Sequence, residues 1–413
     1  MRDFSRPIPQ AFLNIQEKTR SNLFAWRGQF SPQLIESLLT AYCSPGSVVL
    51  DPFAGSGTVL YEAATLSLPA FGYEINPSAW SFSKLYEFAM ASSEKREEAL
   101  LELRTRIKDE FPTVFFSEEI ELKENEFEET VVRIGESLGD SAKIIFNSLV
   151  VFLDVYNKRI SCDLIQSRFG TLTSLIRQLP YSDSPIKADL QDARALPLQD
   201  QSVDFVVTSP PYLNVFNYHQ NYRRSVEVLG WDLLRVARSE IGSNRANRGN
   251  RFYTVIQYCI DMGSVIQELA RVLRTGGRAV LILGHQSKVL GTPFLNADIV
   301  ERLACESGMF RLILRQQRSF KNRYGEAIRE DILNLEKETY RDDNNLSADL
   351  GRDTARCLLT AAEKNVPKRN ESLLLNALSR IDQIVGTPIF NSSCYSQYQT
   401  RDDVMMVRER NST

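Results

Sequence analysis

The residues best suited to chemistry lie in two short stretches that each follow an apolar run. The first stretch, residues 51–58, reads DPFAGSGT and places glycines at positions 55 and 57. Because glycine lacks a Cβ, the backbone there can approach a ligand where a side chain would clash. Glu74 ends the next apolar run, and a carboxylate at that place can accept hydrogen bonds from both hydroxyls of a ribose. The first stretch therefore predicts a nucleoside-containing ligand, and the absence of a Gly-Lys-Ser/Thr motif argues against a nucleoside triphosphate.

The second stretch is TSPPY at residues 208–212, directly after the apolar run Phe205-Val206-Val207. Two consecutive prolines prevent helix formation, remove two backbone donors and stiffen the loop. Such a loop presents hydroxyl and carbonyl acceptors beside an aromatic ring. Taken alone it favours a rigid turn with Tyr212 packed in the core, but its occurrence together with the glycine loop favours a loop that binds a target group.

The elements that must position these stretches are short apolar runs that alternate with helical patterns. The runs predict strands at residues 47–50, 70–73, 186–190, 203–207, 278–283 and 332–335. A helix is predicted over residues 59–64, another after Asn76-Pro77, and a third over residues 265–273, where Thr275-Gly276-Gly277 is expected to end it. Strands that alternate with helices predict an α/β fold with a largely parallel sheet.

Length and composition exclude several classes of protein. The chain has 413 residues, which predicts two or three structural units, and its net charge of -3 excludes a uniformly basic nucleic-acid coat. There is no apolar run long enough for a membrane helix, and the first residues lack the apolar region of a signal peptide. Its six cysteines form no Cys-x-x-Cys pair and it has only two histidines. We therefore expect a cytoplasmic protein with reduced thiols, no metal and no membrane partner.

The glycine loop and the TSPPY loop together resemble the amino-methyltransferases of nucleic acids. Three further segments add to this likeness. Residues 26–32 resemble the segment that these enzymes place beside the methionine end of the cofactor, and residues 189–194 resemble their acidic loop beside the adenine amino group. Residues 268–278 resemble the helix-turn-strand of class I methyltransferases. The resemblance implies S-adenosylmethionine as cofactor and a class I (Rossmann-like, doubly wound) methyltransferase sheet with a helical insertion and a partly helical C-terminal extension.

The resemblance also assigns roles to single residues. In the TSPPY loop, Ser209 and the Pro210 carbonyl hold the amino hydrogens of the target base, Pro211 contributes shape, and Tyr212 stacks on the flipped base. These four residues are the predicted catalytic group. The residues implied to bind the cofactor are Phe30, Pro32, Asp51, Phe53, Gly55, Gly57, Thr58, Glu74 and Asp192.

The target atom follows from the residue before the prolines. In the family, serine there is typical of cytosine targets and aspartate or asparagine of adenine targets, and the loop holds no cysteine for covalent attack on a ring carbon. The resemblance thus favours methylation of cytosine N4 in DNA, in a restriction-modification or defence system. Besides DNA, a cognate restriction endonuclease or another defence component is then an expected partner. The alternatives are adenine N6, a base amino group in RNA or tRNA, and a non-catalytic cofactor-binding subunit.

Contacts to nucleic acid are expected where arginines gather. Residues 217–251 hold seven arginines against Glu227, Asp232 and Glu240, and such a segment suits phosphate contacts, although a solvated loop is the plain alternative. The predicted contact residues are Arg223, Arg245, Arg248, Arg251 and, from a second patch that also holds Arg318, Lys321 and Arg329, Arg323. Lys18 and Arg20 are expected to add to either patch. His219 is a candidate contact and His285 is expected to be structural.

The chain divides into four predicted regions. Residues 1–90 form the first half of the methyltransferase domain with the cofactor site, and residues 181–338 the second half with the target loop and the basic segment. Residues 91–180 form a helical insertion. Its stretch 118–129 has seven glutamates against Lys123 alone, which argues against a DNA-reading surface. Residues 339–413 form a C-terminal extension, polar at first, helical around residues 373–384 and then loose.

Overall fold

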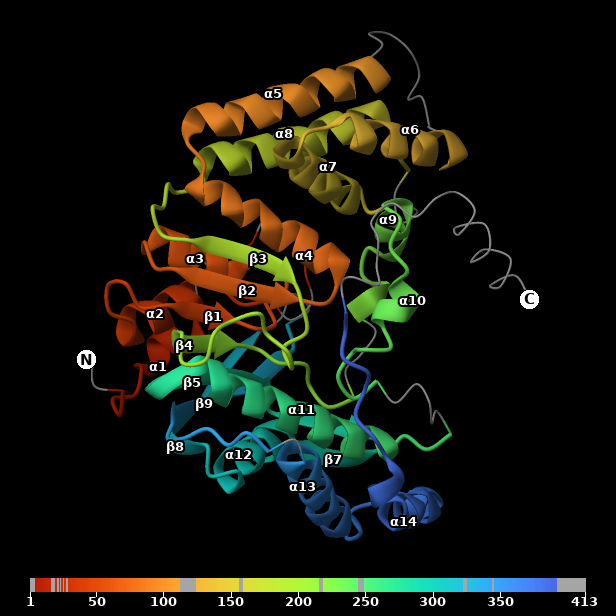
Figure 1. The fold of residues 1–413 in the computed structure, drawn as a ribbon. Helices are drawn as coiled ribbons and strands as arrows, with labels where there is room; N and C mark the ends of the chain where they lie inside the picture. Colours follow the sequence, from red (N-terminus) through yellow and green to blue (C-terminus); the bar gives the residue numbers. More distant parts are fainter. Residues whose placement is uncertain are drawn as a thin grey trace.

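A seven-stranded sheet forms the centre of the molecule in a computed structural model (Figure 1). The structure describes residues 4–15, 19–20, 22, 24, 26, 29–111, 124–155, 159–214, 218–243, 249–321, 325–343 and 345–391. The strand order is β3-β2-β1-β4-β5-β9-β8. The strands are β1 (Val49–Asp51), β2 (Ala70–Glu74), β3 (Ile186–Leu190), β4 (Val203–Thr208), β5 (Leu273–Gly284), β8 (Phe310–Lys321) and β9 (Ala327–Lys337).

The order of the strands reverses between β1 and β4. The strands from β3 to β5 pair in parallel, whereas β9 is antiparallel to both of its neighbours. In an open parallel sheet, loops at such a reversal diverge from the carboxyl ends of the strands and leave room for a ligand. The arrangement confirms the predicted doubly wound class I sheet and places the loops after β1 and β4 at its reversal point.

Side chains of the central strands alternate between two hydrophobic cores. Val49, Phe205 and Val280 lie in the core on one face, and their neighbours Leu50, Val206 and Leu281 lie in the core on the other. Successive side chains of a strand point to opposite faces, so continuously apolar strands require helices on both sides. The strand runs predicted from the sequence are apolar throughout for this reason.

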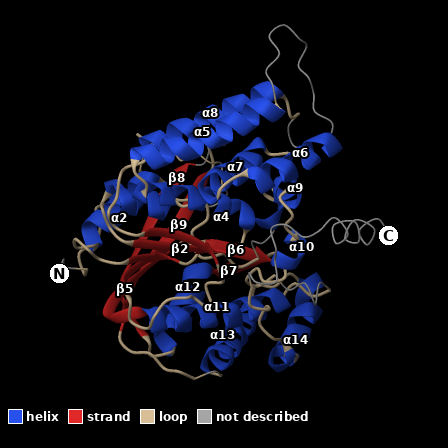
Figure 2. Ribbon diagram, turned by 45° about the horizontal axis from the view of Figure 1, so that its top comes forward, coloured by secondary structure: helices blue, strands red, loops and turns tan. Residues whose placement is uncertain are grey.

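Helices cover both faces of the sheet (Figure 2). The first face carries the helices of the N-terminal part. The helices of the predicted insertion lie on the same side, because α7 packs against α4. These are α2 (Pro32–Tyr42), α3 (Thr58–Thr65), α4 (Pro77–Lys84), η1 (Leu85–Met90), α5 (Ser93–Glu110), α6 (Glu124–Ser137), α7 (Asp140–Leu153) and α8 (Cys162–Gln178). The second face carries α11 (Tyr253–Val272), α12 (Asn296–Glu306), α13 (Leu346–Ala362) and α14 (Glu371–Ser379).

Smaller elements lie near the carboxyl ends of the strands and at the N-terminus. They are α1 (Gln10–Asn14), η2 (Tyr218–Gln220), α9 (Arg223–Val228), α10 (Leu233–Val236), η4 (Lys368–Asn370), η5 (Ile381–Gln383) and the hairpin β6 (Gln286–Val289) and β7 (Thr292–Leu295). No helix among the described residues has both the length and the apolar character needed to span a membrane.

The structure differs from the sequence prediction at several elements. The helix predicted to end at Thr275-Gly276-Gly277 ends at Val272, and β5 begins at Leu273, although its ladder with β4 skips from Leu273 to Arg278. The region predicted to be polar after Lys337 contains α13, which packs against α11. That helix was missed because the face it buries consists largely of small residues, among them Ser347, Gly351 and Thr354, and so lacks a clear apolar period. Residues 112–123 and 392–413 lie outside the described residues.

Candidate active site

The glycine loop connects β1 to α3 and is tied to the end of β2. The Ala54 amide donates to the Tyr73 carbonyl at 2.9 Å, and the Gly55 amide donates to Glu74 Oε2 at 3.0 Å. The other carboxylate oxygen of Glu74 accepts the Ile75 and Asn76 amides, both at 2.9 Å. The backbone of the loop is therefore positioned by the same carboxylate that was predicted to bind a ribose.

The TSPPY loop lies directly beside the glycine loop because β4 pairs with β1. Leu50 is opposite Val206 in this ladder, so the loops that follow the two strands leave the same edge of the sheet. The Thr208 hydroxyl donates to Asp51 Oδ1 at 2.6 Å, and both side chains are buried. The two predicted motifs are thus joined by a hydrogen bond between their first residues.

Two buried side chains fix the shape of the TSPPY loop. The Tyr258 hydroxyl on α11 donates to the Pro211 carbonyl at 3.0 Å. Asn296, at the start of α12, accepts the Leu213 amide at 3.1 Å and donates to the Gly284 carbonyl at 2.7 Å. The loop is therefore fixed to elements on the second face of the sheet as well as to β1.

Tyr212 is held at its hydroxyl and along its ring. The hydroxyl lies 3.3 Å from Ser209 Oγ and donates to Glu330 Oε1 at 3.4 Å. Burial raises the pKa of Tyr212, so the hydroxyl keeps its proton. The ring packs closely against the Cα of Gly284. Glu330 forms an ion pair with the buried Arg318 at 2.6 Å, and this pair holds the carboxylate that accepts the Tyr212 hydroxyl.

A cavity lies at the reversal point and is lined by both loops; its empty space, counted together with the open solvent at its mouth, is about 1080 Å³. Its lining is mostly apolar and aromatic with a few polar groups, as in sites that bind small organic molecules. The lining residues come from the N-terminal segment, the two loops, the end of β2, the loop after β3 and residues 218–241. They are Trp26, Gln29, Phe30, Pro52, Phe53, Ala54, Gly55, Ser56, Thr58, Glu74, Ile75, Asn76, Asp192, Ala193, Ser209, Pro210, Pro211, Tyr212, Tyr218, Val236, Ser239, Glu240 and Ile241.

Within the described residues, the cavity wall carries acidic side chains but no basic ones. Among the described lining residues Glu74, Asp192 and Glu240 are acidic and none is lysine or arginine. Burial raises the pKa of Glu74 to about 7, although the three backbone amides that donate to its carboxylate act to lower it. A wall of this kind favours a cationic ligand and disfavours the phosphates of a dinucleotide or a nucleoside triphosphate. Within the described residues no cluster of three His, Cys, Asp or Glu side chains could hold a metal ion.

Most of the residues predicted to bind the cofactor meet in this cavity. Phe30, Phe53, Gly55, Thr58, Glu74 and Asp192 all line it, together with the four predicted catalytic residues. Asp192 lines the cavity, but its carboxylate oxygens already accept hydrogen bonds from other residues of the chain. Its carboxylate oxygens accept the Nε and Nη2 groups of Arg194 at 2.9 Å and 2.7 Å and the Phe390 amide at 2.9 Å.

Three residues predicted to bind the cofactor do not line the cavity. Pro32 begins α2 and is buried in the first core face. Asp51 is turned toward Thr208 and the Phe53 amide, and burial raises its pKa to about 7. Gly57 faces Tyr86 instead of the cavity. These residues shape the loop from behind.

Gly57 is required by packing and by its backbone angle. Its φ is +88°, and an added Cβ would lie 2.6 Å from Tyr86 Cδ2 and 2.9 Å from Ser83 Cα. We expect Gly57→Ala to lower the free energy of unfolding by about 2–4 kcal/mol, from strain at positive φ and overpacking together. Urea denaturation measures this loss. Gly46→Ala is the matched control, because Gly46 has a φ of +79° but no atom within 4 Å of an added Cβ. An equal loss in both variants would contradict the packing argument.

The residues predicted to contact nucleic acid fall into two groups. Arg245, Arg248, Arg323 and Lys18 lie outside the described residues. Arg223 Nε donates to Glu227 Oε1 at 2.7 Å within α9, and Arg251 Nη2 donates to Asn214 Oδ1. Other candidate contact residues are engaged within the chain. Arg318 is buried against Glu330, Arg20 bridges Glu36 and Glu62, and the buried His219 is paired with Glu240 at 3.0 Å. His285 Nδ1 lies 2.8 Å from Asp331 Oδ2, as a structural histidine would.

Sequence reasoning missed several residues at the site. Trp26 and Gln29 lie in the segment that the resemblance pointed to, and Asn76 caps α4 two residues after Glu74, so all three could have been found from their motifs. Tyr218 and Glu240 also line the cavity, but no motif marks them. They reach it only because residues 218–241 fold across the ends of the strands.

Solved structures of several methyltransferases are weakly similar to this chain. A SAM-dependent methyltransferase of Methanosarcina mazei is 11% identical with a TM-score of 0.35, covering 73% of this chain and 97% of that one. The rRNA methyltransferase aviRa of Streptomyces viridochromogenes is 13% identical with a TM-score of 0.31, covering 79% and 90%. Similarity this weak does not define the fold, which is given by the strand order of the sheet.

The N-terminal part of the chain is similar in sequence to known DNA methylases. A curated relative, the Type II methyltransferase M.MjaII of Methanocaldococcus jannaschii, is 34% identical over 71 residues, which are 16% of this chain and 13% of the relative. The matched part is therefore a small share of that protein's length. The family model for DNA methylases of the N6/N4 type matches residues 5–84, which hold the glycine loop and Glu74. Residues 5–84 are thus similar to the N6/N4 DNA methylases that the motifs resemble.

Proposed function

We propose that this chain transfers a methyl group to the exocyclic amino group of a base in DNA, with cytosine N4 as the target. The cofactor is S-adenosylmethionine, which supplies an electrophilic methyl carbon when bound. One observation carries the proposal: the Thr208–Asp51 hydrogen bond brings the TSPPY loop into the cavity that also holds Glu74. Acceptors for an amine and a carboxylate for a ribose therefore face the same space.

The cavity fits the cofactor in shape and in charge. Glu74 can accept the ribose hydroxyls, and aromatic side chains line the wall at Trp26 and Phe53. The cofactor carries a sulfonium, an ammonium and a carboxylate group, with a net positive charge and no phosphate, which is compatible with a wall whose described residues include acidic side chains and no basic ones.

The TSPPY loop would prepare the amine for attack. The lone pair of an exocyclic amine is delocalised into the base, which makes the group a poor nucleophile. Ser209 Oγ and the Pro210 carbonyl can hold its two hydrogens and so direct the lone pair toward the methyl carbon. Transfer would form a bond between the amine nitrogen and the methyl carbon as the bond from that carbon to sulfur breaks, with S-adenosylhomocysteine as the leaving group, and the displaced amine proton would leave to solvent or to an acceptor in the loop. Tyr212 would stack on the flipped base.

The arginine-bearing segment around α9 and α10 is the proposed path of the DNA backbone. Val236, Ser239 and Glu240 line the cavity, while Arg235 and Arg238 of the same stretch are exposed. Exposed guanidinium groups beside the mouth of an acidic cavity suit phosphate contacts. We propose that Arg223 and Arg251, with Arg245, Arg248 and Arg323, belong to this path. A modification role in a restriction or defence system fits the name of the Type II relative.

Incubation of the purified chain with labelled S-adenosylmethionine and either DNA or transfer RNA tests the proposal. The products are digested to nucleosides and identified by mass spectrometry, and N4-methyldeoxycytidine from DNA is the expected product. N6-methyldeoxyadenosine would overturn the base assignment, and methylation of transfer RNA alone would overturn the polymer. A chain that binds the cofactor but methylates neither polymer would favour the non-catalytic subunit.

A further inference from the structure

The segment that follows α14 returns from the second face of the sheet to the cavity wall. Residues 384–391, drawn in blue, run from α14 past α10 (Figure 1). Thr387 and Phe390 are buried, whereas Val385 and Ile389 are 67% and 55% exposed. The segment is therefore anchored at selected positions and does not simply lie on the surface.

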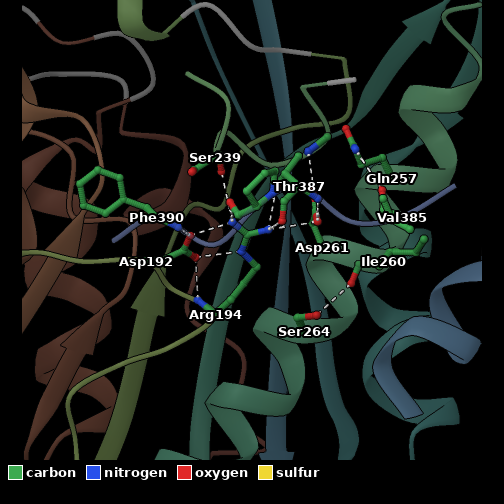
Figure 3. A network of polar contacts seen from close by, with 12 residues as sticks. Asp192, Arg194, Ser239, Gln257, Ile260, Asp261, Ser264, Val385, Thr387 and Phe390 are labelled. Carbon is green, nitrogen blue, oxygen red and sulfur yellow. Dashed lines mark hydrogen bonds and ion pairs between the residues drawn. The ribbon is translucent and has the colours of Figure 1, made fainter. Parts of the chain in front are cut away.

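Arg194 is the centre of the anchor (Figure 3). The residue is only 8% exposed, and its guanidinium group contacts the segment at three acceptors. Nη1 donates to the Thr387 carbonyl at 3.0 Å and to its Oγ1 at 2.6 Å, and Nη2 donates to the Pro388 carbonyl at 3.1 Å. The same guanidinium group donates to Asp192 and to Asp261 Oδ1.

Asp261 on α11 completes the anchor. It is 1% exposed, and its carboxylate accepts the Thr387 amide at 2.8 Å and the Thr387 hydroxyl at 3.1 Å. The hydroxyl of Thr387 therefore links Arg194 to Asp261. Two buried carboxylates, Asp192 and Asp261, share one guanidinium group here, so the polar contacts from the segment are needed to offset their burial.

The anchor is continuous with the wall of the cavity. Asp192 lines the cavity and accepts the Phe390 amide, and Ser239 lines it and accepts from Arg194 Nη2 at 3.3 Å. Asp261 Oδ2 accepts the amide of Gly242 at 2.8 Å, next to the lining residue Ile241. These wall residues lie outside helices and strands, so the ladder of the sheet does not fix their positions.

We propose that residues 385–390 are a positioning element for the cofactor, which sets the wall formed by residues 192–193 and 239–241 through Arg194 and Asp261. The inference rests on the proposed function, because it concerns which part of the chain sets the affinity of the cofactor site. The segment does not touch the TSPPY loop in any described hydrogen bond. Its loss should therefore weaken cofactor binding and leave the chemical step intact.

The substitution Gly386→Ala tests this with little change elsewhere. An added Cβ would lie 2.8 Å from Asp261 Oδ1, so either the segment or the Asp261 carboxylate must shift, and either movement disturbs the anchor. Titration calorimetry with S-adenosylhomocysteine is expected to show a Kd about tenfold higher than in the wild type. The KM for S-adenosylmethionine should rise by about the same factor while kcat at saturation stays within about twofold. Gly170→Ala is the matched control, because no atom lies within 4 Å of a Cβ added on α8.

A second pair of variants separates positioning from folding. Thr387→Val removes the hydroxyl that links Arg194 to Asp261 and should weaken binding, whereas Thr387→Ser keeps the hydroxyl and should bind as the wild type does. Equal Kd values for Thr387→Val, Gly386→Ala and the wild type would overturn the inference and leave the proposed function standing. A fall in kcat with unchanged KM would also overturn it. A wild-type chain that binds no S-adenosylhomocysteine would overturn the proposed function and this inference with it.

Discussion

Replacement of Tyr212 by alanine is expected to reduce kcat by about ten- to a hundredfold, because stacking of a base on an aromatic ring is worth about 1–3 kcal/mol. The ring lines the cavity and is fixed by its contact with Gly284 and by the hydroxyl bond to Glu330. It is therefore preorganised to receive a flipped base. Single-turnover methylation of DNA measures the loss, and calorimetry with S-adenosylhomocysteine should give an unchanged Kd.

Tyr212→Phe is the control that separates the ring from the hydroxyl. Phenylalanine keeps the stacking surface and the contact with Gly284, but it loses the hydrogen bond at 3.4 Å to Glu330. Its kcat should stay close to that of the wild type. If Tyr212→Ala methylated DNA at the wild-type rate, the stacking assignment would be wrong; if Tyr212→Phe were as slow as Tyr212→Ala, the hydroxyl and not the ring would carry the effect.

Substitution of Glu74 by glutamine should raise the Kd for S-adenosylhomocysteine by about ten- to a hundredfold, because a hydrogen bond to a charged group is worth about 1.5–3 kcal/mol. The effect should depend on pH. Burial raises the pKa of Glu74 to about 7, so the side chain without ligand is partly protonated at neutral pH. Because the ribose hydroxyls bind the carboxylate, the wild-type affinity should rise as the pH increases through about 7. Calorimetry over a pH series measures this, and Glu74→Gln should flatten the dependence.

Glu62→Gln is the matched control for Glu74. Burial also raises the pKa of Glu62 to about 7, but Glu62 lies on α3 in an ion pair with Arg20 and does not line the cavity. Its substitution should change the stability of the fold and leave cofactor affinity and its pH dependence as they are. A pH dependence that persists in Glu74→Gln would point to Asp51, the other buried carboxyl of this loop.

Sequence alone determined the strands around the site and the identity of its two loops. Glycine at positive φ, consecutive prolines and continuous apolar runs are local requirements, so a short stretch such as residues 51–58 or 208–212 carries them in its own residue types. For the same reason the predicted strands at residues 70–73, 186–190 and 203–207 coincide closely with β2, β3 and β4. Glu74 was placed correctly for the same reason, because it is the last residue of β2.

Tertiary structure alone decided how residues distant in the chain share the site. The packing of Gly57 against Tyr86, the contact of Asp192 with Phe390, and the placement of Glu240 in the cavity depend on which loops the sheet brings to one edge. Hydrogen bonds of this kind join residues nearly two hundred positions apart, and neither partner's local sequence specifies the other. The strand order supplies that information, because it sets which carboxyl ends lie side by side.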